Sequence, residues 1–327
     1  MKAAIIVAPR KIEIREVETP KPVDGQVLIR TRCAAICGSD HPFFQGIQTY
    51  RKPPLPPGHP GHETMGVVAE SRTPDFSPGD AVIAIPKGDC GFAEYFVADA
   101  ARACRLPPGH DGDEMVVAQP LATVVRAFRR LAHAPRNTAC VLGVGNMGLL
   151  WVQMLRHRMS EGARELGQSR TLICSGSPHA STGTSELGQT EARPPQADCS
   201  GPLPSDGKSS PALQRHSPTS WGLQDGIPGS ATRVIAIDLL ANRLAVARQV
   251  GATDTVDASK QDPVAEVTKL TADKMADLVV EAVGFEETLT TCLRLARTGG
   301  EVFAFGVPRY PIYQFPMREY FRRQLTM

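Results

Sequence analysis

The sequence has little net charge, no long apolar run and few cysteines for its length. Of its 327 residues, 36 are basic and 34 acidic, which leaves a net charge of +2. So small an excess gives no field strong enough to recruit nucleic acid or an anionic membrane, and we expect neither partner. The first apolar run, residues 3–8, is too short for a signal-peptide core, and Pro9, Arg10 and Lys11 follow it at once. We therefore expect a cytoplasmic protein in which this run forms a strand.

The cysteine content excludes a disulfide framework. Eight cysteines lie in the chain without tight regular spacing, which is typical of reduced thiols in a reducing compartment. Hydrophobic residues make up 42% of the sequence, enough to fill the core of one large domain or two ordinary ones. The composition therefore indicates a soluble globular protein.

Two patterns of hydrophobic residues divide the chain. Residues 1 to about 110 contain short runs rich in Val and Ile between Gly and Pro, which predict a small β-rich unit. A helical pattern follows from about residue 113, and Pro120 starts or interrupts it. Beyond it, strand and helix patterns alternate, which predicts an α/β fold with a doubly wound parallel sheet. We place the two domains at residues 1–125 and 126–327.

One segment does not fit the alternation. Residues 161–230 contain 12 Ser, 10 Gly and 8 Pro but no Val, Phe, Tyr or Met. Such a segment cannot bury enough apolar surface to offset the entropy of ordering it, so we expect a disordered insertion over residues 159–231. A retained intervening sequence or gene-model artefact explains it as well as a functional linker does. Because it follows the first helix of the sheet and precedes the second strand, we expect it far from the edge where ligands bind.

A glycine-rich turn opens the second domain. Residues 143–148, GVGNMG, have the form G-x-G-x-x-G, follow the apolar run ACVL and open a helical pattern. In this context the pattern predicts a dinucleotide-binding turn. Gly143 permits the tight turn, Gly145 lets the backbone approach a diphosphate, and Gly148 allows close packing of helix on strand. The diphosphate would bind the N–H groups of Asn146, Met147 and their neighbours.

An acidic residue at the end of the second strand would bind the ribose of the cofactor. Asp238 follows RVIAI but lies 95 residues after Gly143, and leaving out the 70 unusual residues reduces this spacing to 25, near the roughly 20 of the fingerprint. An acid at this position repels a 2′-phosphate, so we expect NAD rather than NADP. Asp238 could instead cap the helix that begins near Ala241. Arg243 could lie along the adenosine or be a solvated helix charge.

The stretch PPGHPGHETMG, residues 56–66, places polar side chains among glycines and prolines. Prolines and glycines interrupt regular structure, and buried polar groups need partners, so packing alone does not explain this stretch. Its GHETMG segment has the form G-H-E-x-x-G, and Cys37 of ICGSD lies 24 residues before its first glycine. A GD turn at residues 79–80 and a GFAEY stretch at residues 91–95 follow.

In this order and spacing, these motifs resemble the zinc-dependent medium-chain alcohol and polyol dehydrogenases, in particular the sorbitol and threonine dehydrogenase branch. The resemblance implies a GroES-like catalytic domain followed by a Rossmann domain, with a catalytic zinc in the cleft between them and NAD as cofactor. Cys37 and His62 match the thiolate and imidazole ligands, which suit zinc. Glu63 would be the third ligand or a neighbour able to exchange with water. Gln119, where the polyol branch has a glutamate, would contact the zinc-bound water.

The resemblance also indicates which residues would carry the proton relay and whether a second, structural zinc is expected. Ser39 matches the hydroxyl that takes the proton of the alcohol, whereas the usual relay histidine is replaced by Pro42, with His41 one residue early. The family's structural zinc needs four cysteines between the GD turn and GFAEY, where this chain has only Cys90, so we expect no structural zinc. We interpret His59 as a turn or surface histidine outside the ligand set.

The chain ends at YFRRQLTM, where the family would begin a sixth Rossmann strand, so we expect a truncated product. The expected function is a zinc-dependent, NAD-linked oxidoreductase acting on a secondary alcohol or polyol. Two alternatives stay open: an inactive dinucleotide-binding remnant and, more weakly, a zinc-free quinone reductase. Homo-oligomers are possible, although the region that family dimers use is partly absent.

Overall fold

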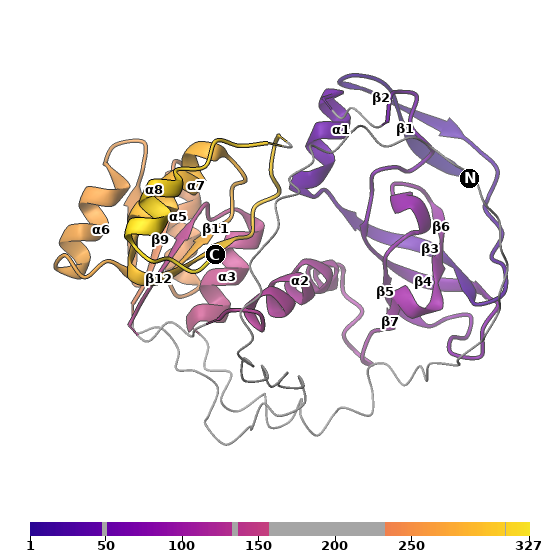
Figure 1. The fold of residues 1–327 in the computed structure, drawn as a ribbon. Helices are drawn as coiled ribbons and strands as arrows, with labels where there is room; N and C mark the ends of the chain where they lie inside the picture. Colours follow the sequence, from indigo (N-terminus) through magenta and orange to yellow (C-terminus); the bar gives the residue numbers. More distant parts are fainter. Residues whose placement is uncertain (48–50, 133–136, 157–232, 311) are drawn as a thin grey trace, which may run out of the picture. The chain divides into compact units, whose positions relative to one another are not determined.

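The computed structural model describes residues 1–47, 51–132, 137–156, 233–310 and 312–327 (Figure 1). The predicted insertion over residues 159–231 lies outside these described residues, and its disorder stays a prediction. The chain enters the second strand of the parallel sheet at Arg233, aligned with Thr138 at the amino-terminal edge.

The N-terminal part consists of antiparallel strands, as the short Val- and Ile-rich runs predicted. Strands β1 (Lys2–Ala8) and β2 (Lys11–Glu16) form a two-stranded sheet. A five-stranded sheet has the order β6-β3-β4-β5-β7. Its strands are β3 (Gln26–Ala35), β4 (Glu63–Ser71), β5 (Ala81–Ala84), β6 (Tyr95–Asp99) and β7 (Ala103–Arg105). Its inward side chains form one core, which includes Val27, Ile29, Val68, Val82 and Phe96.

Short helical segments connect these strands and lead out of the sheet. Helix α1 (His41–Gln45) follows the 3₁₀ turn η1 (Gly38–Asp40), and η2 (Lys87–Asp89) and η3 (Ala100–Arg102) flank β6. The turn η4 (Asp113–Val117) runs into helix α2 (Ala118–Phe128). Pro120 lies in the first turn of α2, where a missing backbone N–H costs nothing. The helical pattern therefore predicted α2 correctly, with Pro120 near its start.

The C-terminal part is a parallel sheet of order β10-β9-β8-β11-β12. In chain order its elements are β8 (Thr138–Leu142), α3 (Asn146–Arg156), β9 (Arg233–Asp238), α5 (Ala241–Gln249), β10 (Asp254–Asp257), α6 (Pro263–Thr271), β11 (Ala276–Glu281), α7 (Glu286–Leu295), β12 (Ala296–Ala304) and α8 (Met317–Arg322). The predicted doubly wound sheet is thus confirmed. The sequence pattern EVFAFGV, residues 301–307, predicts a further strand, but β12 begins five residues before it, and the sequence patterns did not indicate α6 or α7.

Each strand of the parallel sheet sends alternate side chains to opposite faces, because the side-chain period of a strand is two residues. Along β8, Ala139 and Val141 pack with Trp151 of α3 and Leu244 of α5, together with α2 residues, in one core. The intervening residues of β8 pack in a second core with side chains of α6 and α7, among them Cys140, Leu142, Val267, Cys292 and Leu293. Both faces of the sheet are therefore covered, which accounts for strands that are apolar throughout.

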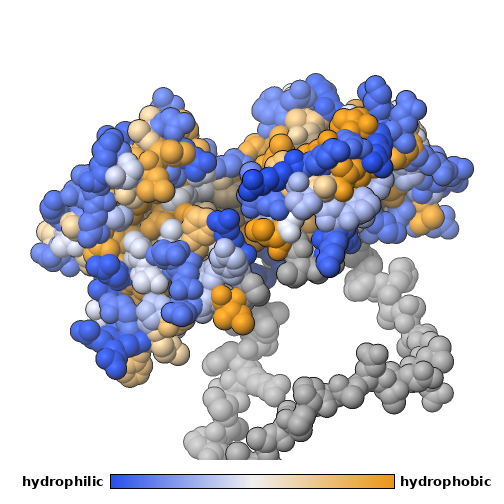
Figure 2. All heavy atoms as spheres, turned by 90° about the horizontal axis from the view of Figure 1, so that it is seen from above, coloured by the Kyte–Doolittle hydropathy of each residue, from blue (hydrophilic) through white to orange (hydrophobic). Residues whose placement is uncertain are grey.

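The described residues end beside β12. Thr326 forms a parallel bridge with Glu301, and its N–H donates to the carbonyl oxygen of Gly300 at 3.0 Å. The expectation of a truncated product stays a prediction. Within the described part of the chain, every helix is too short or too polar to cross a bilayer. On the face shown in Figure 2, hydrophilic residues cover most of the surface and hydrophobic residues lie in separate patches.

Candidate functional site

Antiparallel pairing of β3 and β4 brings the two metal-binding motifs together. The last residue of β3, Ala35, is aligned with Glu63, the first residue of β4. Cys37 follows the end of β3 by two residues, and His62 precedes the start of β4 by one. Residues 25 positions apart in the sequence therefore lie side by side at one end of the sheet.

The ligand atoms of Cys37, His62 and Glu63 lie within 4.8 Å of one another. A tetrahedral zinc with bonds of about 2.0–2.3 Å holds its donor atoms roughly 3.3–3.8 Å apart, so a small inward shift would bring these donors into reach of one ion. Glu63 is only 4% exposed, and no described residue forms a hydrogen bond or ion pair with its carboxylate. A buried, unpaired carboxylate is costly, so its environment calls for a cation. The three side chains therefore fit a divalent metal ion in their chemistry and spacing.

The imidazole of His62 is held in the orientation that a metal ligand needs. Its Nδ1 lies 2.9 Å from the carbonyl oxygen of Pro60 and 3.3 Å from Oδ1 of Asp40. Because both neighbours are acceptors, the ring proton belongs on Nδ1, which leaves the lone pair of Nε2 available to a metal. Asp40 is buried, and its other oxygen accepts a hydrogen bond of 2.9 Å from the N–H of Cys37. Asp40 thus positions two of the predicted ligands at once.

Without a metal, the same contacts favour the protonated imidazole. The hydrogen bonds with Asp40 and Cys37 raise the pKa of His62 to about 11, against the opposing effect of burial. A metal ion must displace the proton from Nε2, so binding at this cluster releases protons.

Asp40 is a candidate positioning residue that the sequence motifs did not single out. It is the last residue of the CGSD segment, so it lies in the motif that identified Cys37. The spacing of three residues between Cys37 and Asp40 could have indicated this contact. A single turn, η1, brings the Asp40 carboxylate back to the N–H of Cys37.

The structure places only one of the other residues predicted around the metal next to the three ligands. Ser39 Oγ lies 3.4 Å from Nε2 of His62, so this hydroxyl is next to the cluster. His41 is exposed at the start of α1. Gln119 lies in the first turn of α2, and no described residue contacts its side chain by a hydrogen bond. The ligand role of Gln119 and the relay role of Ser39 stay predictions.

His59 and the glycines of residues 56–66 serve packing. His59 is 5% exposed, its Nδ1 lies 3.0 Å from the carbonyl oxygen of Gly88, and its ring meets Phe43 edge-on. It lies in a turn, as predicted, but the surface alternative is wrong because Phe43 and Gly88 cover it. A Cβ on Gly61 would lie 2.7 Å from the backbone nitrogen of Phe92, and one on Gly66 would lie 2.1 Å from a backbone oxygen. Neighbouring backbone therefore excludes a side chain at both glycines.

The glycine-rich turn connects β8 to α3 at the carboxyl edge of the parallel sheet. Gly143 has φ of 90°, a left-handed conformation that favours glycine. A Cβ on Gly148 would lie 1.9 Å from the carbonyl oxygen of Gly143, so helix and turn approach too closely for a side chain. A Cβ on Gly145 would meet only Arg243 Nη1 at 3.9 Å, an ordinary contact. The fold therefore requires Gly143 and Gly148, whereas the open space at Gly145 fits a ligand that lies on the backbone.

The start of α3 offers backbone donors to such a ligand. The first N–H groups of a helix have no partner within it, and no described residue accepts a hydrogen bond from Asn146 or Met147. The helix N-terminus also carries partial positive charge. Gly143, Gly145, Asn146, Met147 and Gly148 therefore form a turn that fits the diphosphate of a dinucleotide.

Asp238 ends β9 beside this turn, and its carboxylate is already engaged. Oδ2 accepts a hydrogen bond of 2.9 Å from Val144 N–H, and Oδ1 accepts one of 3.0 Å from Leu240 N–H. Arg243 Nη1 lies 3.7 Å from Oδ2. Each carboxylate oxygen can accept a second hydrogen bond, so ribose hydroxyls remain possible partners. Asp238 does not cap α5, because the helix has no side-chain cap and Asp238 binds the N–H of Leu240, the residue before the helix.

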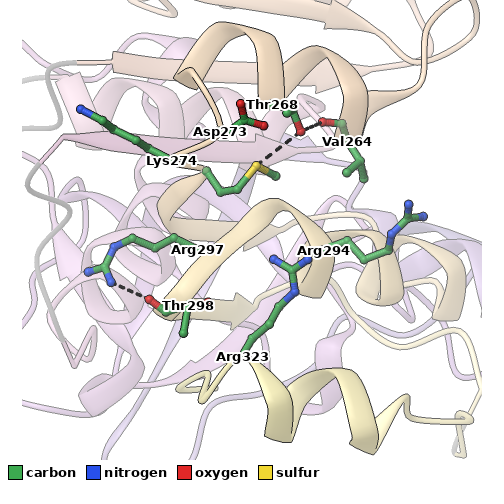
Figure 3. Close-up of a pocket in the computed structure, with 9 residues that line it drawn as sticks. Val264, Thr268, Asp273, Lys274, Arg294, Arg297, Thr298 and Arg323 are labelled. Atoms are coloured by element: carbon green, nitrogen blue, oxygen red, sulfur yellow. Dashed lines mark hydrogen bonds between the residues drawn. The ribbon is translucent and has the colours of Figure 1, made fainter.

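A separate pocket of about 540 Å³ lies where β11 and β12 begin (Figure 3). Four basic side chains line it: Lys274, Arg294, Arg297 and Arg323. Arg297 is paired with Asp277 at 2.7 Å, Arg323 with Glu319, and Asp273 lies in the wall. Acidic groups thus offset most of this basic charge. The pocket is at the amino-terminal edge, opposite the edge where ligands bind in such sheets.

Two family models match the chain, one on each part. Residues 23–135 match the alcohol dehydrogenase GroES-like domain, and residues 229–327 match the zinc-binding dehydrogenase model. The chain belongs to the zinc-type medium-chain alcohol dehydrogenase family.

Two dehydrogenases are among the relatives of similar sequence. The chain is 30% identical to a glucose 1-dehydrogenase of Metallosphaera sedula over 48% of its own length and 56% of that protein's, so it spans about half of this relative. It is 22% identical to an L-threonine 3-dehydrogenase of Bacillus velezensis over 91% of its own length and 74% of the other.

Solved structures share the fold. The alcohol dehydrogenase TADH from Thermus sp. ATN1 matches with a TM-score of 0.67 and 22% identity, over 100% of this chain and 83% of that one. A zinc-binding dehydrogenase from Sinorhizobium meliloti bound to NADP has the same TM-score and identity, over 99% and 82%. The RspB dehydrogenase of Escherichia coli, complexed with NADH, has a TM-score of 0.66 and 19% identity, over 100% and 82%.

Proposed function

We propose that this chain is a zinc-dependent dehydrogenase that transfers hydride between a secondary alcohol or polyol and NAD. The observation that carries the proposal is the convergence of Cys37, His62 and Glu63, with Glu63 buried and without a partner among the described residues. A thiolate, a neutral imidazole and a carboxylate are zinc ligands, and three protein ligands leave a coordination position open. An open position is typical of catalytic rather than structural zinc.

Zinc bound by these residues supplies a Lewis acid that polarises an alcohol oxygen and lowers the pKa of its hydroxyl. The chain's own residues supply orientation and proton transfer. Asp40 holds His62 and the backbone of Cys37, and Ser39 lies beside Nε2 of His62, where its hydroxyl can accept the proton of the alcohol. Gln119 is proposed as a neutral oxygen donor near the metal, and solvent completes the relay in place of the histidine that this chain lacks.

Bound NAD would supply the hydride acceptor in this reaction. We propose that its diphosphate binds the backbone of Gly145, Asn146 and Met147, and that the ribose hydroxyls donate to Asp238. Two observations support the choice of NAD. The Asp238 carboxylate lies at the end of β9, where a 2′-phosphate would meet its charge, and Arg243 is already paired with it.

The experiment is to measure zinc content together with NADH formation on a panel of secondary alcohols and polyols. We expect about one zinc per chain and NADH formation with at least one polyol. Cys37→Ser and His62→Ala should lose both zinc and activity. Cys33→Ser is the matched control, because Cys33 lies on β3 outside the three-residue cluster.

The alternatives give different results. Zinc binding that depends on Cys37, without turnover of any substrate, would support the inactive remnant. Quinone reduction that survives Cys37→Ser would support a zinc-free reductase and contradict the proposal.

A further inference from the structure

A second carboxylate lies beside Asp238 at the carboxyl edge of the parallel sheet. Strand β10 ends at Asp257, which is aligned in register with Asp238 at the end of β9. The N–H of Ala258 donates to the carbonyl oxygen of Asp238 at 2.9 Å, so the pairing continues past the strand ends. Neighbouring strands lie about 4.8 Å apart, and aligned residues of a parallel pair point to the same face. The two carboxylates are therefore adjacent.

The carboxylates of Asp257 and Asp238 have similar surroundings: each accepts at least one backbone hydrogen bond and lies near a basic side chain. Asp257 accepts hydrogen bonds from the N–H and hydroxyl of Ser259, and Lys260 Nζ lies 2.8 Å from its Oδ2. These contacts with Lys260 and Ser259 lower the pKa of Asp257 to about 2, which keeps it ionised. The Asp257 side chain is 16% exposed and that of Lys260 is 72% exposed. The Asp238 side chain is likewise shielded, at 6% exposed, and that of its neighbour Arg243 is 49% exposed. Each end carries an acid whose cation faces solvent.

We propose that Asp257 is a second specificity-determining residue, which together with Asp238 disfavours NADP because it neutralises Lys260, a cation that would otherwise attract the 2′-phosphate. This inference rests on the proposed function, because it takes the adenosine ribose to lie at the end of β9. A phosphate group carries about −1.5 to −2 charges near neutral pH. Aligned strand ends are closer than the Debye length of about 8 Å at physiological ionic strength, so salt screens charges at Asp257 only in part from a group bound at Asp238.

The proposal assigns a role to Lys260 as well. In the unaltered chain Asp257 neutralises this lysine, so it offers no net attraction to a phosphate. Asp257→Asn keeps an oxygen that can accept from Ser259 but loses the charge, and it leaves Lys260 unpaired. NADPH should then bind about three- to tenfold more tightly, whereas NADH affinity should change by less than about twofold. Adding Lys260→Met should remove part of the gain for NADPH.

The matched control is Asp254→Asn. Asp254 begins the same strand, is partly buried and lies 3.4 Å from Arg233, so its replacement changes the net charge equally. It lies three positions before Asp257, about 10 Å along the strand and toward the opposite edge of the sheet. We expect Asp254→Asn to leave the ratio of NADH to NADPH affinity unchanged.

The test measures dissociation constants of NADH and NADPH by nucleotide fluorescence for the full chain and each variant. A selective gain for NADPH in Asp257→Asn, partly reversed by Lys260→Met and absent in Asp254→Asn, supports the inference. Tight NADH binding with no change in the ratio for Asp257→Asn overturns the inference and leaves the proposed function standing, and an equal shift in Asp254→Asn overturns it too. Failure of the unaltered chain to bind either nucleotide overturns both.

Discussion

The metal-ligand cluster and the glycine-rich turn are both built where strands end, but they use opposite means. At the end of β3 and the start of β4, the side chains of Cys37, His62 and Glu63 converge, and Asp40 holds them. At the end of β8, the turn presents backbone because Gly145 has no side chain. A soft divalent ion needs specific donor atoms, whereas an extended diphosphate needs close approach to N–H groups. The comparison teaches that the first site depends on which side chains are present, whereas the second depends on the lack of a side chain at Gly145.

Removing the metal should have the largest effect and should act on the first site alone. Dialysis against a chelator is expected to lower turnover about a thousandfold or more, because the Lewis acid is lost. NADH affinity should stay within about twofold, since the two sets of residues share no side chain. Turnover and NADH titration before and after zinc is restored check this. A parallel fall in NADH affinity would contradict the independence of the two sites.

Alanine variants at two glycines of the turn should affect different properties, one the stability of the fold and the other the binding of NADH. Gly148→Ala should destabilise the fold by about 3 kcal/mol or more, because its Cβ would overlap the backbone oxygen of Gly143, which cannot move aside alone. Gly145→Ala should leave the denaturation midpoint nearly unchanged and weaken NADH binding about tenfold or more.

Urea denaturation and NADH titration of both variants make this comparison. If Gly145→Ala bound NADH normally, the assignment of the diphosphate to this turn would be wrong.

Asp40→Asn should weaken zinc binding about 10- to 100-fold. The asparagine oxygen can still accept from Cys37 N–H, but its amide nitrogen then faces the ring N–H of His62, donor against donor. Zinc affinity is measured by competition with a chromophoric chelator, and the Asp99→Asn variant, which alters a carboxylate held by Gln26, serves as control. Equal zinc affinity for Asp40→Asn and the unaltered chain would show that Asp40 does not position the ligands.

His59→Asn should have the smallest effect and should not touch the metal. Loss of the contact between His59 and Gly88 O is expected to lower the free energy of unfolding by about 1–2 kcal/mol. Zinc content should stay equal to that of the unaltered chain. A loss of zinc from His59→Asn would place His59 in the ligand set and contradict the assignment of His62 to the metal and His59 to packing.

Much of the fold could be predicted from the sequence because its patterns are local. The apolar runs ACVL and RVIAI predicted β8 and β9 to within one residue at each end, since central strands buried on both faces are continuously apolar. Helices α6 and α7 were not proposed, because their apolar residues are sparse and only their packing under β10, β11 and β12 reveals the buried face. The early start of β12 was hidden by polar residues, Arg297 to Gly300, that precede its apolar core.

The sequence by itself determined the chemistry: a thiolate, an imidazole and a carboxylate in a family motif, and a glycine pattern between a strand and a helix. Only the tertiary structure decided which residues meet. Antiparallel pairing brings Cys37 to His62, the turn η1 folds Asp40 back under both, and the register of β9 and β10 sets Asp257 beside Asp238. The reason is physical, because side-chain type fixes what a residue can bind, whereas strand pairing between distant segments fixes its neighbours.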